Sequence, residues 1–154
     1  MKQRGRPRVA EQAEKKGEVD YRALSEFRYH MRLYLRHMET QCRKRDINPQ
    51  QYLLMLAIKG MPEGEEATIA FIAGRLQLNH NSTVELADRC EQCGLIRRMP
   101  SKVDRRRVCL KLTAKGDRTL RTLGDAARQE MRVLGPGLIQ SVSALVNGNG
   151  AVHK

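Results

Sequence analysis

Residues 94–116, GLIRRMPSKVDRRRVCLKLTAKG, constrain the fold more than any other segment of this chain. Apolar and polar residues alternate over 95–99 and again over 108–112, which predicts two short strands joined as a β-hairpin. The tip between them cannot belong to a hydrophobic core, because its cations repel one another and would be buried without partners. We therefore expect the tip to meet something acidic. Its cations are Lys102, Arg105, Arg106 and Arg107.

The overall charge agrees with an acidic partner. The chain of 154 residues carries 29 Lys and Arg against 17 Asp and Glu, a formal net charge of +12, which suits a nucleic acid or an anionic membrane surface. Its length fits one domain with a single core. No apolar run is long enough to span a bilayer, and the first residues lack the apolar region of a secretory signal. We therefore expect a cytoplasmic protein, whose cysteines are free thiols.

Apolar spacings of three and four predict a mainly α-helical chain around the hairpin. Residues 1–20 are polar and charged and predict a mobile basic arm. A long amphipathic helix follows over about 21–45, and Asn48 and Pro49 then open a helix that ends at Gly60. Thr68 is expected to cap a short helix, and a second helix starts near His80 and ends at Gly94.

After the hairpin, Thr113 is expected to cap a helix that runs to about Leu134. The tripeptide 135–137, Gly-Pro-Gly, is expected to break this helix, because proline cannot continue the hydrogen-bond ladder. A last helix is expected over about 138–146, and residues 147–154 are expected to form a frayed tail. Two short helices joined by about three residues, followed at once by a hairpin, match a helix-turn-helix with a β wing.

In this order of elements, the segments STVELADRCEQCGLIRR and DRRRVCLKLTAKG resemble the MarR family of bacterial winged helix-turn-helix transcription regulators. The resemblance covers about residues 21–146, and the family's wing pattern falls on Asp104, Arg106, Leu112 and Thr113. It implies a mainly α fold with a small β-hairpin wing at about 95–112. It also implies N- and C-terminal dimerisation helices at about 21–45 and 114–146.

The resemblance further implies a recognition helix that lies in the major groove of DNA. Asn81 is then suited to adenine, Ser82 and Thr83 to bases or phosphates, and Glu85 to a cytosine amino group, although a solvated helix residue is an equal reading of Glu85. In the wing, Arg106 would enter the minor groove, the other cations would hold phosphates, and Asp104 would orient its neighbouring arginine. The expected contacts of the recognition helix come from His80, Asn81, Ser82, Thr83 and Glu85.

The N-terminal arm adds a weaker signal for DNA. Residues 4–8, RGRPR, resemble the core of an AT-hook, in which Arg4 and Arg6 would point into the minor groove. General attraction of a basic arm to phosphates is the alternative reading.

The functional prediction is a sequence-specific DNA-binding regulator, and specifically a repressor that binds a pseudo-palindromic operator as a homodimer. It would be associated with the nucleoid of a bacterial cytoplasm when bound to DNA. In the family, a small aromatic or phenolic effector releases DNA from many members. The aromatic and histidine residues that could line an effector cleft are Tyr29, Tyr34, Tyr52, His30 and His37.

Two alternatives stay open. One is an architectural or weakly specific DNA-binding protein, which would use the arm and the wing without a defined site. The other is a thiol-based redox or metal sensor built on Cys90 and Cys93, although small core residues are the favoured reading of this pair. We expect no bound metal, no cofactor and no enzymatic activity, because the sequence carries no nucleophile elbow, phosphate-binding glycine loop or metal-ligand cluster.

Overall fold

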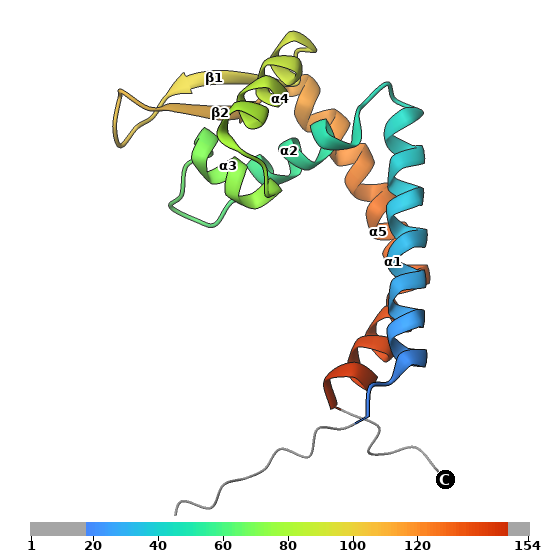
Figure 1. The fold of residues 1–154 in the computed structure, drawn as a ribbon. Coiled ribbons are helices and arrows are strands. Elements are labelled where there is room, and N and C mark those ends of the chain that lie inside the picture. Colours follow the sequence, from blue (N-terminus) through green and yellow to red (C-terminus); the bar gives the residue numbers. More distant parts are fainter. Residues whose placement is uncertain (1–17, 148–154) are drawn as a thin grey trace, which may run out of the picture.

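The computed structural model describes residues 18–147, which form five helices and one antiparallel hairpin (Figure 1). Most of the expected basic arm, with Arg4 and Arg6, and residues 148–154 of the expected tail lie outside these residues. No helix within 18–147 is long and apolar enough to cross a membrane. The elements are α1 Tyr21–Arg43, α2 Pro49–Lys59, α3 Ile69–Leu76, α4 His80–Gln92, β1 Ile96–Pro100, β2 Val108–Leu112 and α5 Ala114–Asn147.

Polar side chains begin the short helices where the sequence places them. Asn48 and Gln51 form a reciprocal capping box at the start of α2, with Pro49 at the first helical position. The Thr68 side chain accepts a hydrogen bond from the Phe71 backbone N–H at the start of α3. Asn79 caps α4 in the same way. These caps satisfy backbone donors that a helix leaves unpaired, so the helix starts are fixed locally.

A third backbone segment, which the sequence did not indicate, pairs with the hairpin along the outer edge of β2. Ile96 pairs with Leu112 and Pro100 with Val108, which leaves residues 101–107 as the tip. On the other side of β2, Cys109 bridges to Thr68, and the Leu110 N–H donates to the Ala67 carbonyl over 2.9 Å. The chain just before α3 therefore supports the wing along its open edge.

One core joins the helix-turn-helix, the hairpin and the start of α5. Gly116, in the first turn of α5, lies so close to the residue before β1 that a Cβ atom there would be 1.9 Å from the Leu95 carbonyl oxygen. This close approach fixes where α5 leaves the wing. The largest fully buried side chains are Leu54, Met55, Ile72, Leu86, Leu95, Ile96, Leu110 and Leu123.

The expected break at 135–137 does not occur, because α5 is one helix with Pro136 inside it. Pro136 is exposed, and so is Arg132, the residue whose carbonyl the proline leaves without its helical partner, so water can satisfy that carbonyl. Gly137 faces α1, and a Cβ atom there would lie 2.3 Å from His30 Nε2. The prediction of two helices was wrong because packing against α1 overrides the local signal.

Helices α1 and α5 run antiparallel and extend away from the rest of the fold, while the hairpin projects on the other side (Figure 1). The expected stripe on α1 is only partly covered. Met38 and Cys42 are buried, whereas Leu35 is 53% exposed. On α5, Ile139 is 69% exposed. The pair therefore presents apolar surface that one chain does not bury.

Candidate nucleic-acid interface

The first turn of α4 presents polar side chains to solvent. His80, Asn81 and Glu85 are exposed and Ser82 is half-buried. The Ser82 N–H donates to the Asn79 side chain over 2.8 Å, so the cap holds this turn in place. The structure thus leaves four of the five expected recognition residues accessible on one helix.

Thr83, the fifth expected recognition residue, is buried. Its side chain is 0% exposed, and its hydroxyl donates to the Asn79 carbonyl over 2.8 Å. A side chain that is buried and already hydrogen-bonded cannot reach a base or a phosphate without a change in the helix. Thr83 is therefore part of the junction between α4 and the core, and the expectation of a DNA contact was wrong.

All four expected cations of the wing tip are exposed. Asp104 shapes the turn that carries them. Its carboxylate accepts from the Arg106 backbone N–H over 3.0 Å and lies 3.8 Å from Nε of Arg107. Among the described residues, no carboxylate lies within 4 Å of the side-chain nitrogens of Arg105, Arg106 or Lys102. Those three charges are available to an external anion.

The tip is fastened to the body by Glu66 and Ser101, two residues that sequence reasoning missed. Ser101 is 3% exposed, and its hydroxyl donates to the Glu66 carboxylate while accepting from the N–H groups of Val103 and Asp104, each over 3.0 Å. The other carboxylate oxygen of Glu66 accepts from the Lys102 N–H over 2.8 Å. The hydrogen bond from Ser101 and that from the Lys102 backbone hold the pKa of Glu66 below its usual range.

A second missed contact joins the wing to the recognition helix. Arg98 on β1 bonds the carboxylates of Asp88, over 2.6 Å, and of Glu91, both on α4. The Arg98 backbone N–H also donates to Glu91, over 3.1 Å. The spacing of seven and ten residues across a turn has no helical or strand periodicity, so no sequence pattern could have indicated it.

Cys90 and Cys93 lie in different environments and do not form a joint redox or metal site. Cys90 is buried, and burial raises the pKa of its thiol to about 12, so the thiol stays protonated and unreactive at neutral pH. Cys93 is exposed, contrary to the expectation of a core residue, and the Gln51 amide donates to its sulfur over 3.6 Å. Residues 18–147 contain no group of three or more His, Cys, Asp or Glu side chains that could hold a metal ion.

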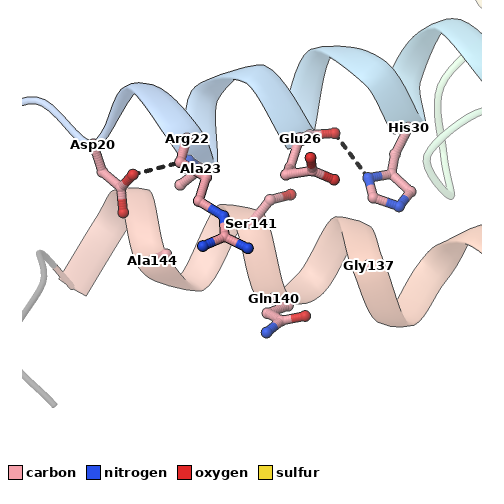
Figure 2. Close-up of a pocket in the computed structure, with 9 residues that line it drawn as sticks. All are labelled: Asp20, Arg22, Ala23, Glu26, His30, Gly137, Gln140, Ser141 and Ala144. Atoms are coloured by element: carbon pink, nitrogen blue, oxygen red, sulfur yellow. Dashed lines mark hydrogen bonds between the residues drawn. The ribbon is translucent and has the colours of Figure 1, made fainter. Parts of the chain in front are cut away.

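The residues expected to line an effector cleft are dispersed within one chain. Tyr29 is exposed, Tyr52 is buried in the core beside Tyr34, and His37 Nδ1 lies 3.3 Å from Glu130. His30 alone of the five lines the cavity in Figure 2, a space of about 490 Å³ between α1 and the end of α5. Its other lining residues are mostly polar or small: Asp20, Arg22, Ala23, Glu26, Gly137, Gln140, Ser141 and Ala144.

The fold is that of a winged helix-turn-helix protein. It has two short helices joined by a tight turn, then a hairpin with a basic tip, and then a long final helix. Residues 45–107 match the model of the MarR family. This match agrees with the MarR family that the sequence resembles. No curated protein matches the sequence.

Solved structures share the fold at low sequence identity. AbsC, a MarR family transcriptional regulator from Streptomyces coelicolor, is 18% identical over 79% of this chain and 84% of its own, with a TM-score of 0.64. A MepR variant from S. aureus bound to an oligodeoxyribonucleotide is 21% identical over 80% and 84%, with a TM-score of 0.57. CouR from Rhodococcus jostii RHA1, bound to p-coumaroyl-CoA, is 15% identical over 87% and 96%, with a TM-score of 0.62.

Proposed function

We propose that this protein is a sequence-specific DNA-binding transcriptional regulator that represses by occupying a pseudo-palindromic operator as a homodimer. The observation that carries the proposal is the basic wing tip, which stands on a turn fixed by Asp104. Among the described residues, Lys102, Arg105 and Arg106 have no carboxylate partner, and Arg107 has only Asp104 at 3.8 Å. Such a tip lies in the chain directly after a helix-turn-helix with an exposed first turn. A MepR variant of the same fold is bound to an oligodeoxyribonucleotide, which supports DNA as the anion.

In this proposal the two elements have different tasks. His80, Asn81, Ser82 and Glu85 read base edges in the major groove, where each base pair presents a distinct pattern of donors and acceptors. Arg106 enters the minor groove, and Lys102, Arg105 and Arg107 contact phosphates. Arg4 and Arg6, which lie outside the described residues, would add minor-groove or phosphate contacts from the arm.

Dimerisation follows from the apolar surface on α1 and α5. Exposed apolar side chains of this size are costly in water, and a twofold partner would cover both helices at once. Such a dimer places two recognition helices on successive major grooves, which requires an operator with two half-sites about 34 Å apart. The exposed large apolar residues of the pair are Tyr21, Leu24, Tyr29, Leu35, Val133, Ile139, Val142 and Val146.

The proposal is tested by competition binding of a duplex recovered from a random pool against its scrambled sequence at fixed salt. A specific regulator keeps a preference of several kcal/mol for the recovered duplex, on the order of 4 kcal/mol or more, whereas equal competition would indicate an architectural protein instead. The variant Arg106→Ala should lose affinity, most strongly on A·T-rich flanks, and should lower the slope of log affinity against log salt by about one.

The matched control is Arg118→Ala, which removes an exposed arginine of α5 that makes no ion pair with the described carboxylates. Its effect should be small. Equal binding by Arg106→Ala and the parent would count against the wing assignment.

We also propose that a small aromatic or phenolic effector releases the DNA. CouR, which shares the fold, is bound to an aromatic acyl-CoA, and this supports an aromatic class of ligand. Titration of a panel of phenolic acids into the complex with DNA, followed by fluorescence anisotropy, tests this part separately.

We propose that the protein acts by binding and without catalysis, and that it is associated with the bacterial nucleoid, because both follow from a regulator of this family.

A further inference from the structure

The wing tip is built on a hydrogen-bond network that begins outside the wing. Glu66 belongs to the segment between α2 and α3, 35 residues before Ser101 in sequence. Its two carboxylate oxygens accept from the Ser101 hydroxyl and from the Lys102 N–H, and the Ser101 hydroxyl accepts from two further N–H groups of the tip. Three consecutive backbone donors, those of residues 102–104, are therefore satisfied directly or indirectly by one carboxylate.

We infer that Glu66 is a positioning residue for DNA binding, which acts through Ser101 to hold the wing tip in the shape that presents Lys102 and Arg106. This inference rests on the proposed function, because it concerns how the wing reaches DNA. Glu66 is not expected to touch DNA. It acts by fixing the backbone from which the cations project, so that less conformational entropy is lost when DNA binds.

The network is well suited to this role because it is directional and partly buried. Charge-assisted hydrogen bonds are roughly twice as strong as neutral ones, and the Ser101 hydroxyl can donate one hydrogen bond, which it gives to Glu66. With that hydrogen directed at Glu66, both lone pairs of the hydroxyl face the N–H groups of Val103 and Asp104. Glu66 therefore sets the orientation of the hydroxyl that closes the tip.

If Glu66 positions the tip, its substitution changes the affinity for DNA in the direction opposite to that expected from charge alone. A negative charge beside a phosphate-binding tip repels DNA, so its removal should tighten binding if Glu66 acts only through charge. If Glu66 positions the tip, Glu66→Gln should instead weaken binding. Glutamine keeps only one acceptor oxygen, so in either orientation of its amide an N–H group faces one of the two donors, the Ser101 hydroxyl or the Lys102 N–H, and the network loses that hydrogen bond.

The matched control is Glu65→Gln, which removes the same charge from the neighbouring exposed residue, whose side chain makes no hydrogen bond with the described residues. We expect Glu65→Gln to bind DNA as tightly as the parent or more tightly. We expect Glu66→Gln and Ser101→Ala each to lose about tenfold in affinity for the duplex recovered from a random pool, the scale of one charge-assisted hydrogen bond. The double variant should lose little more than either single variant, because both break one network.

Amide hydrogen exchange of the free protein supplies a measurement that does not need DNA. In Glu66→Gln and Ser101→Ala, exchange should accelerate at residues 102–104 and stay unchanged in the cores of α4 and α5, with melting temperatures near that of the parent. Unchanged exchange at the tip, or tighter DNA binding by Glu66→Gln, would overturn the inference. Failure of the parent to bind any duplex would instead refute the proposed function, and the exchange result would still decide whether Glu66 holds the tip.

Discussion

Gly116→Ala tests the contact that sets the angle between the wing and α5. A methyl group at this position would lie 1.9 Å from the Leu95 carbonyl oxygen, whereas ordinary C···O contacts are about 3.3 Å, so the helix start must move by more than about 1 Å. The obstacle is backbone and cannot rotate away. The same turn holds Thr113, whose hydroxyl donates to the Gly94 carbonyl over 2.6 Å and accepts from the Gly116 N–H over 3.0 Å, so a shift also strains this cap.

The net cost is the sum of two destabilising effects less one gain. Overpacking costs about 1–3 kcal/mol and loss of a cap about 1 kcal/mol, while alanine gains about 1 kcal/mol over glycine inside a helix. We expect a net loss of about 1–3 kcal/mol in the free energy of unfolding. Urea denaturation followed by far-UV circular dichroism, at one fixed protein concentration, measures it.

The control is Gly124→Ala in the same helix. A Cβ atom there meets no atom within 4 Å, so only the helix-propensity gain remains and stability should rise by up to about 1 kcal/mol. The two substitutions are chemically identical and should act in opposite directions. If Gly116→Ala proves as stable as the parent, the close approach of α5 to the Leu95 backbone is wrong.

Two further predictions concern thiols and acid. In the folded protein, a thiol reagent should modify Cys93 alone of the four cysteines. The other three are buried, and burial raises the pKa values of their thiols. Modification of a second thiol at a comparable rate would contradict this expectation. The pKa of Asp117 is lowered by hydrogen bonding to Lys59. A carboxyl with a lowered folded pKa contributes stability above the unfolded value and loses it as pH falls, so the melting temperature should drop below about pH 4.5, and less steeply in Asp117→Asn.

The sequence predicted the helix starts well because caps are local. Asn48, Thr68 and Thr113 each bond a backbone group within three residues, so the pattern and the contact coincide. The break at Pro136 was predicted from the same local chemistry and was wrong, since an exposed proline on a helix packed against α1 loses one bond that water can replace.

The contacts that hold the wing could not be predicted, because they join residues far apart in sequence. Glu66 and Ser101 are separated by 35 positions, and a Glu in a loop rich in acids gives no sign of its partner. Thr83 was misassigned because its neighbours on the first turn of α4 are exposed, and its burial depends on how the helix sits on the core. Cys93 was misassigned because it follows the last turn of α4, where the helical period no longer determines burial.

The proposed regulator reads DNA as a symmetric dimer through α4 and the wing. Selection of bound duplexes from a random pool tests it most directly, because one result reports specificity, symmetry and spacing together. We expect an inverted repeat whose half-sites lie about one helical turn apart, with A·T-rich sequence where the wings reach the minor groove. Recovery of no shared sequence, or of a single unrepeated site, would contradict it.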